Sequence, residues 1–313
     1  MIYREIQRAI ITGPTGTIGN ALIKRLREAA IEVYAVVRPG SPRVAMLPKD
    51  DGIHIIECDA SKLERLPALI PNGADALFHL AWGNTIGTGR NDMLSQIDNI
   101  RNTIFAARAS ASLGCKVFVG AGSQAEYGRV DGIIKADTPC FPENGYGMAK
   151  LCAGQMSRIE SETIGIDHIW IRVLSIYGPH DGPMTMISST IKTLLEKKKP
   201  LLTAGNQKWD YLYCSDAANG LFCAATSGKN GAIYPLGSGT SRPLREYIEI
   251  MRDAIDPALH LGFGEISYSA KQVMHLEADI SDLQNDTGFY PQVNFETGIR
   301  NTIDWLKDNI YCH

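Results

Sequence analysis

The chain has 313 residues, of which 44% are hydrophobic and 21% are charged, and its formal net charge at pH 7 is -3. This composition excludes a disordered or fibrous chain and allows a large buried core. Because the chain has no broad basic field, we expect no nucleic acid partner.

A glycine-rich segment lies near the N-terminus, between the apolar run 9–11 and the helix-compatible segment 20–26. Its residues are Thr12-Gly13-Pro14-Thr15-Gly16-Thr17-Ile18-Gly19. Gly13 would allow a tight turn, Gly16 would let backbone N–H groups approach a diphosphate, and Gly19 would let the helix pack closely on the strand. The first N–H groups of that helix then face an anion. A simple tight turn is the alternative, but this position in the chain favours dinucleotide binding.

Apolar runs of strand length alternate with helical patterns in the first part of the chain. The sequence predicts further strands at residues 32–37, 54–59, 76–81, 116–120 and 168–173, and long helices at 94–113 and 146–164. Continuous apolar runs suit parallel strands that are covered on both faces. The alternation therefore predicts an α/β fold with a doubly wound parallel sheet of the Rossmann type.

The rhythm changes beyond Pro179, where the predicted elements become shorter and less regular. We expect a dinucleotide-binding domain over residues 1–180, with a return segment near 205–235, and a smaller C-terminal substrate-binding lobe that covers most of 181–313. This lobe would close over the edge of the sheet.

Arg38 follows the second predicted strand, where an NAD-selective site usually carries an acidic side chain that holds the ribose 2′-hydroxyl. A guanidinium there would instead pair with a 2′-phosphate, and Ser41 could add a hydroxyl. We therefore predict NADP as the cofactor; NAD remains the alternative if Arg38 is a solvated loop cation. Asp59 ends the third strand and could either accept from the adenine amine or cap the next helix.

A phenol and an ammonium group, Tyr146 and Lys150, stand one helical turn apart on the same face of a predicted helix. An opposite charge nearby lowers the pKa of a phenol, so we expect Tyr146 to exchange a proton with a substrate oxygen near neutral pH. Ser123 lies in the loop after the fifth strand, and its hydroxyl could donate a second hydrogen bond to that oxygen.

The cysteines show no C-x-x-C pair and no His/Cys cluster at metal-ligand spacing, and the sequence predicts no metal site. They are Cys58, Cys115, Cys140, Cys152, Cys214, Cys223 and Cys312. We interpret them as small apolar side chains of a reduced protein. The N-terminus lacks the apolar segment of a signal peptide and no stretch is long enough to cross a bilayer, so we expect a cytoplasmic protein without a membrane partner.

The motifs, taken in chain order, resemble those of the extended short-chain dehydrogenase/reductase family, which includes sugar-nucleotide epimerases, dehydratases and reductases. They are T-G-x-x-G-x-x-G, His79-Leu80-Ala81-Trp82, Asn99, the Ser123 loop that ends in Tyr127-Gly128, Y-x-x-x-K, Arg172 with Ile176-Tyr177-Gly178-Pro179, and the segment from Trp209 to Ala217. The resemblance covers nearly the whole chain.

The resemblance implies that Ser123, Tyr146 and Lys150 form a catalytic triad, with Tyr146 as the general acid/base. It also implies hydride transfer between the nicotinamide and a sugar carbon, and a homodimer formed through the helices that contain Asn99 and Tyr146. The implied dinucleotide contacts are Gly13, Thr15, Gly16, Thr17, Ile18, Arg38, Ser41, Asp59, Ala60, Leu80, Ala81, Trp82, Tyr146 and Lys150. For Trp82, ordinary packing is an equal alternative.

Two departures from the family pattern bear on the reaction. Dehydratases of the family carry an acidic residue two positions before the tyrosine that ends the Ser123 loop, where this chain has Ala125, and Glu126 would serve only if the loop were shifted. His180 occupies the position of an acid/base histidine of GDP-fucose synthase, but the partner cysteine would fall at Ala125. A role for His180 and a place in an ordinary loop both remain open.

What remains is hydride chemistry without acid/base groups for a neighbouring carbon. We expect an NADPH-dependent reductase of the 4-keto group of a nucleotide-activated deoxysugar, with a nucleotide-sugar 4-epimerase that keeps NAD bound as the near alternative. A non-catalytic NADP-sensing regulator on the same fold is a third possibility. Candidate substrate contacts are Asn84, Gln124, His180 and Arg242.

Overall fold

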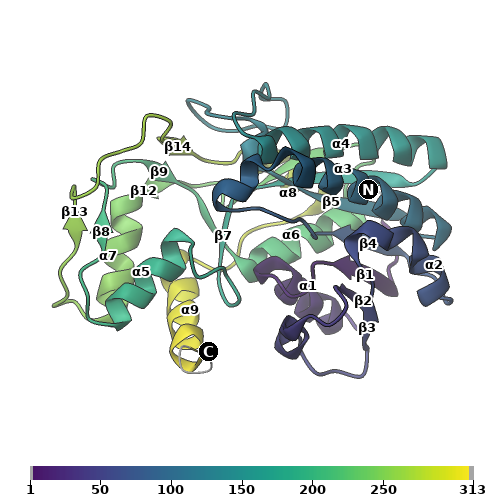
Figure 1. Ribbon diagram of the computed structural model, residues 1–313, viewed down its shortest axis with the longest axis horizontal. Coiled ribbons are helices and arrows are strands. Elements are labelled where there is room, and N and C mark those ends of the chain that lie inside the picture. Colours follow the sequence, from purple (N-terminus) through teal and green to yellow (C-terminus); the bar gives the residue numbers. More distant parts are fainter. Residues whose placement is uncertain (1–2, 310–313) are drawn as a thin grey trace.

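The structure is a computed structural model that describes residues 3–309. A seven-stranded parallel sheet forms the centre of the protein (Figure 1). Cys312 lies outside the described residues. The strand order is β11-β6-β5-β4-β1-β2-β3, which confirms the doubly wound α/β fold. The strands are β1 (Arg8–Thr12), β2 (Glu32–Val37), β3 (Ile53–Glu57), β4 (Ala76–His79), β5 (Val117–Ser123), β6 (Asp167–Val173) and β11 (Ile233–Leu236).

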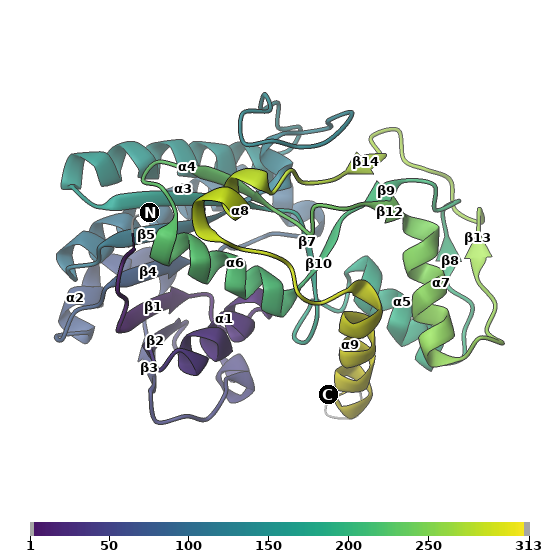
Figure 2. The same ribbon diagram turned by 180° about the vertical axis from the view of Figure 1, so that it is seen from behind.

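Helices cover both faces of this sheet. Figure 2 shows α1 (Thr17–Glu28), α6 (Cys214–Ser227) and α8 (Ser281–Thr287) over one face. The other face is covered by α2 (Leu66–Leu69), α3 (Met93–Ser112) and α4 (Gly145–Ile164). Because successive residues of a strand point to opposite faces, Ile10 packs in the core under α3 while Ile11 packs in the core under α1. Both side chains are fully buried, as their apolar runs predict.

A smaller lobe lies beyond the carboxyl ends of the strands, on the left in Figure 1. Its helices are α5 (Met186–Leu195), α7 (Leu244–Ile255) and α9 (Phe295–Asn309), and its short strands are β7 (Ser175–Tyr177), β8 (Leu201–Leu202), β9 (Lys208–Trp209), β10 (Tyr211–Tyr213), β12 (Arg242–Pro243), β13 (Gly262–Phe263) and β14 (His275–Leu276). The helices enclose a separate apolar core that includes Ile191, Ile248 and Ile299. The proposed domain limits at residue 180 remain a prediction, since α6, β11 and α8 return to the main sheet.

Short 3-10 helices lie in the loops that follow β2, β3, β4 and β5. They are η1 (Pro42–Met46), η2 (Ala60–Arg65), η3 (Gly87–Asn91) and η4 (Gln124–Glu126). The strand order reverses at β1, which pairs with β2 on one side and with β4 on the other. In doubly wound sheets a ligand lies at the carboxyl ends of the strands at this switch point.

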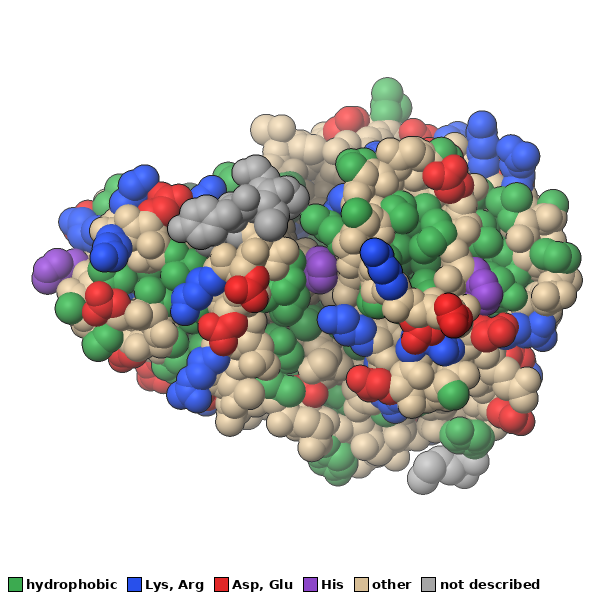
Figure 3. Space-filling view, turned by 90° about the horizontal axis from the view of Figure 1, so that it is seen from below, with side chains coloured by type: hydrophobic (Ala, Val, Ile, Leu, Met, Phe, Trp, Pro, Cys, Tyr) green, Lys and Arg blue, Asp and Glu red, His purple; other side chains and the backbone are tan. Residues whose placement is uncertain are grey.

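The molecular surface seen from below mixes Lys and Arg side chains with Asp and Glu side chains (Figure 3). Within residues 3–309, no helix combines the length and the apolar character that a bilayer crossing requires.

Candidate active site

The glycine turn between β1 and α1 has the geometry that its glycines predict at two positions. Gly13 adopts a φ of 72°, and a Cβ there would lie 2.8 Å from the backbone N of Ala81. A Cβ on Gly19 would collide with the Gly13 carbonyl, so α1 packs on the turn as closely as predicted. At Gly16 a Cβ would meet nothing closer than the Gly13 carbonyl oxygen at 3.7 Å, so any need for glycine there would come from a ligand.

The N-terminus of α1 is open toward the switch point. Gly16 is its N-cap, and among the residues that the structure describes no side chain caps the helix there. The first N–H groups of a helix lack partners within the helix and carry a partial positive charge. This turn therefore fits a diphosphate, as the glycine spacing predicts.

A cavity of about 480 Å³ runs along the carboxyl ends of β1 to β4. Its lining includes the predicted dinucleotide contacts Gly13, Thr15, Arg38, Ser41, Asp59, Ala60, Ala81 and Trp82. Leu80 lies beside it, where its N–H donates to the Thr12 carbonyl at 3.1 Å. Ile18 is instead packed against the core under α1. Several elements far apart in the chain thus meet around one elongated space of the kind a dinucleotide requires.

Cationic side chains are part of the lining of this cavity. Arg38 and Ser41 lie there with Arg43, whose Nη2 donates to the Thr15 carbonyl at 2.8 Å. Asp59 accepts from Ser61 N at 2.9 Å, which caps η2 and lowers the pKa of the Asp59 carboxyl. Of the two roles open to Asp59, the structure shows the cap.

The predicted triad comes from two neighbouring elements. Ser123 is the last residue of β5, and Tyr146 and Lys150 lie in the first turns of α4. Asn144 fixes the start of α4, because its side chain accepts from Gly147 N at 2.9 Å. The Ser123 side chain hydrogen-bonds to the Tyr146 phenol. The structure therefore brings Ser123 and Tyr146 together and places Lys150 one turn further along α4; Trp82, which packs on Tyr146 and Lys150, lines the cavity.

The expectation of a lowered pKa for Tyr146 was wrong. Burial raises the pKa of the Tyr146 phenol, against the lowering effects of Ser123 and Arg90. Lys150 is turned elsewhere: its Nζ donates to the Ala121 carbonyl at 2.6 Å and lies 5.9 Å from the centre of the Tyr146 ring. Burial also lowers the pKa of Lys150 to about 7, which weakens its charge near neutral pH.

Trp82 connects the triad to the loop after β4. The Lys150 Nζ lies 3.8 Å from the centre of the Trp82 ring, and the Tyr146 ring meets it edge-on at 6.1 Å. The Trp82 Nε1 donates to the Gln96 Oε1 at 2.9 Å. Trp82 therefore packs against Tyr146 and Lys150 and also lines the cavity, and its contact with a dinucleotide stays a prediction. The sequence analysis missed Gln96, and no motif marks it.

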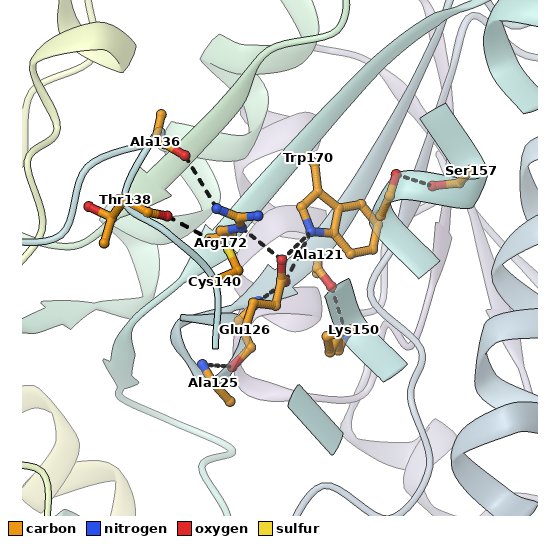
Figure 4. Close-up of polar contacts among 12 residues, drawn as sticks. Ala121, Ala125, Glu126, Ala136, Thr138, Cys140, Lys150, Ser157, Trp170 and Arg172 are labelled. Atoms are coloured by element: carbon orange, nitrogen blue, oxygen red, sulfur yellow. Dashed lines mark hydrogen bonds and ion pairs between the residues drawn. The ribbon is translucent and has the colours of Figure 1, made fainter. Parts of the chain in front are cut away.

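Glu126 is buried. Figure 4 shows its side chain between Trp170 and Arg172. Its Oε1 accepts from Ser123 N at 2.8 Å and from Trp170 Nε1 at 3.0 Å, and its Oε2 accepts from Arg172 Nε at 2.7 Å. A carboxylate held in this way lies away from the cavity. The shifted loop that would have made Glu126 a dehydratase acid does not occur.

The sequence model of the NAD dependent epimerase/dehydratase family matches residues 9–237, which include the glycine turn and all three triad residues. The chain belongs to this family. Its resemblance to the extended short-chain dehydrogenase/reductases that act on nucleotide sugars is thereby confirmed, and the chain is an enzyme of the epimerase/dehydratase family.

Relatives within the family differ in their reactions. A dTDP-glucose 4,6-dehydratase from Neisseria meningitidis serogroup B is 24% identical, with 97% of this chain and 94% of the relative covered. A UDP-N-acetylglucosamine 4-epimerase from Methanobrevibacter ruminantium, solved with UDP-N-acetylmuramic acid, has a TM-score of 0.87 at 22% identity and covers 99% of this chain and 100% of its own. The dTDP-glucose 4,6-dehydratase DesIV from Streptomyces venezuelae, solved with NAD and TYD, has a TM-score of 0.84 at 22% identity, with 96% and 97% covered. These structural similarities show a shared fold.

The candidate substrate contacts of this epimerase/dehydratase family member lie in several places. Gln124 begins η4 directly after Ser123. Asn84 lies in the loop after β4, where its Nδ2 donates to the Ser95 Oγ at 2.8 Å. Arg242 is in the smaller lobe and pairs with Glu296 at 2.6 Å. Gln124 and Asn84 are therefore close in sequence to residues of the triad or the cavity, whereas Arg242 already has an acidic partner.

His180 lies in a second cavity, of about 230 Å³, between α1 and the start of α6. Its ring packs on Trp305 with 4.9 Å between the ring centres, and Lys24 faces it. Burial and the nearby cations lower the pKa of His180. Thr17, predicted as a dinucleotide contact, lines this second cavity as well. The structure does not bring His180 into the group formed by Ser123, Tyr146 and Lys150.

Among residues 3–309, no group of three or more His, Cys, Asp or Glu side chains is arranged to hold a metal ion.

Proposed function

We propose that the protein reduces the 4-keto group of a nucleotide-activated deoxysugar with NADPH. The observation that supports this most directly is that Ser123 and Tyr146 lie together, with Lys150 one turn away on α4, next to Trp82, which lines the elongated cavity. Ala125 stands where dehydratases of the family have an acid, and the Glu126 carboxylate is bound to Arg172. Elimination of water would therefore lack its base, whereas Ser123, Tyr146 and Lys150, the residues that hydride transfer requires, are all present.

Each member of the triad has a role that follows from its chemistry. The bound nicotinamide would supply the hydride. Ser123 and Tyr146 would donate hydrogen bonds to the carbonyl oxygen of the sugar, and Tyr146 would then give that oxygen its proton. Lys150, whose Nζ lies 5.9 Å from the centre of the Tyr146 ring and donates to the Ala121 carbonyl, would assist through its positive charge, which favours the loss of that proton. Removing the hydroxyl of Tyr146, as in Tyr146→Phe, should therefore stop the proton transfer.

The cations in the lining of the cavity support NADP over NAD. Arg38 and Arg43 can both pair with a 2′-phosphate, and Ser41 lies beside them. Against this stands the NAD bound in DesIV and in the related WbmG from Bordetella bronchiseptica. We give more weight to the charges of this chain, since an acid that would hold the ribose 2′-hydroxyl is absent at the end of β2, where Arg38 stands.

A nucleotide-sugar 4-epimerase with bound NAD is the second candidate. The observation that favours it is the full-length structural match to the 4-epimerase from Methanobrevibacter ruminantium. The same triad would take the proton of the C4 hydroxyl while the bound NAD accepts the hydride of C4; the hydride would then return to the other face of the 4-keto carbon and the proton to its oxygen. A non-catalytic NADP sensor would have no need for all three triad residues, so we rank it last.

We also propose that the protein is a homodimer, because α3 and α4 expose apolar side chains in the described part of the chain. Leu94 is 76% exposed and Ile97 is 57% exposed on α3, while Met148, Met156 and Ile159 are exposed on α4. An apolar patch of this kind is typical of a surface that binds a partner. The smaller lobe as the substrate-binding domain, Asn84, Gln124, His180 and Arg242 as substrate contacts, and a cytoplasmic location remain proposals.

The reductase proposal is tested by incubating the purified protein with NADPH and a panel of nucleotide 4-keto-6-deoxysugars. We expect NADPH oxidation with at least one of them and loss of that activity in Tyr146→Phe. Epimerisation of a nucleotide sugar by protein that already contains NAD, without net NADPH oxidation, would support the second candidate instead.

A further inference from the structure

We propose that Arg90 is a positioning residue that stabilises the phenolate form of Tyr146. This inference rests on the proposed function, in which Tyr146 exchanges a proton with the substrate. The carbon at the centre of the Arg90 guanidinium lies 4.6 Å from the centre of the Tyr146 ring. That distance is within the range of a cation–π contact, and a phenolate ring would attract the cation more strongly than a neutral phenol.

The position of Arg90 is fixed by its neighbours. The side chain of Asn91, the next residue, accepts from Gly145 N at 2.9 Å, and Gly145 directly precedes Tyr146. The backbone also packs tightly here, because a Cβ on Gly145 would lie 2.9 Å from the Arg90 carbonyl oxygen. On the other side of η3, Gln96 Nε2 donates to the Gly89 carbonyl at 3.2 Å. The contact of Asn91 with Gly145 thus fixes the loop of Arg90 against the start of α4, where Tyr146 lies.

Arg90 has a free charge to offer. It is half-buried, and no residue within 3–309 forms a hydrogen bond or an ion pair with its guanidinium. A half-buried cation without an acidic partner has a stronger effect on a nearby titrating group than a paired surface arginine.

The other groups that face Tyr146 contribute less positive charge to the phenolate than Arg90 does. Ser123, at the end of β5, hydrogen-bonds to the phenol. Lys150, on α4, is turned toward Ala121 and Trp82. Glu126, on η4, carries a negative charge that opposes the phenolate, although Arg172 pairs with it. Arg90, on η3, is therefore the full and unpaired positive charge nearest to the ring among the described groups.

The experiment measures how Tyr146 titrates. Tyr146 is replaced by 3,5-difluorotyrosine, whose more acidic phenol brings the titration into an accessible pH range, and fluorine NMR then follows this single residue. Difluorotyrosine is introduced at position 146 in four proteins: the parent, Arg90→Met, Arg90→Lys, and Arg252→Met, which is a matched control in α7. No substrate is needed, so the result is independent of whether the proposed reaction is correct. Thermal melts establish that each variant is folded.

We expect Arg90→Met to raise the titration midpoint by about one pH unit, a shift typical of losing an opposite charge at this range. Arg90→Lys should keep most of the parent behaviour, and Arg252→Met should match the parent. In assays with a working substrate, the limb of the pH profile that reports Tyr146 should move upward in Arg90→Met by a similar amount. An unchanged midpoint in Arg90→Met, with or without weaker substrate binding, would overturn the proposal, as would an equal shift in Arg90→Lys.

Discussion

The Oε2 of Glu126 lies 2.7 Å from the Nε of Arg172, and both side chains are buried. This pair holds the loop of the catalytic serine, because the same carboxylate accepts from Ser123 N. The glutamate next to the position of the dehydratase acid is thus bound to an arginine and to the backbone of the serine loop.

Replacing Glu126 with Gln should destabilise the protein strongly, because it leaves the buried guanidinium of Arg172 without a counter-charge. We expect a loss of about 3 kcal/mol in the free energy of unfolding, measured by chemical denaturation. Glu143→Gln is the matched control, since its partner Arg129 lies at the surface, with 44% of that side chain exposed, and its loss should cost less than about 1 kcal/mol. Equal losses in the two variants would contradict a structural role for the buried pair.

Removing the cation at the end of β2 should change the cofactor preference. In Arg38→Ala we expect the affinity for NADPH to fall by about 10- to 100-fold, the loss of a charge-assisted contact with the 2′-phosphate, and the affinity for NADH to change little. Titration of nucleotide fluorescence measures both affinities. Parallel losses for the two nucleotides would show that Arg38 does not read the phosphate.

The unusual environment of Lys150 should appear in the pH dependence of stability. Burial lowers its pKa to about 7, so between about pH 7 and the ordinary pKa near 10.5 the unfolded chain binds more protons than the folded protein. The free energy of unfolding therefore gains a contribution from Lys150 that rises with pH across this window. Lys150→Met should abolish that contribution, so the stability difference between variant and parent should depend on pH. A difference that is constant from pH 7 to 10 would contradict the assignment.

The apolar surface of α3 and α4 should form the dimer contact. We expect the double variant Leu94→Glu and Ile97→Glu to run as a monomer in size-exclusion chromatography with light scattering, while the parent runs as a dimer. Leu201→Glu is the control, because Leu201 is also exposed, at 57%, but lies in the smaller lobe. A parent protein that is monomeric at micromolar concentration would remove this proposal.

The fold could be predicted from the sequence because its signals are local and periodic. The apolar run that contains Ile10 and Ile11 buries one side chain on each face of the sheet, and such runs mark parallel strands directly. The glycine turn could also be predicted, because a φ of 72° at Gly13 and the close approach at Gly19 require glycine at a specific spacing.

Contacts between distant segments could not be predicted in the same way. The pairing of Glu126 with Arg172 depends on how β6 lies beside β5, and the place of Arg90 over Tyr146 depends on an irregular loop without periodicity. The prediction of a lowered pKa for Tyr146 was wrong for a related reason. The spacing along α4 predicts that Lys150 is near, but it does not predict that the Lys150 ammonium turns toward Ala121. Desolvation depends on the packed structure as a whole.

The most direct test of the reductase proposal follows the hydride itself. NADPH that carries deuterium at the reactive carbon of the nicotinamide is incubated with a nucleotide 4-keto-6-deoxysugar and either the parent protein or Tyr146→Phe. We expect deuterium at carbon 4 of the sugar with the parent, and a rate at least about 100-fold lower with the variant, the usual contribution of a general acid. Equal rates in the two proteins, or a product that has lost water and carries no deuterium, would contradict the account.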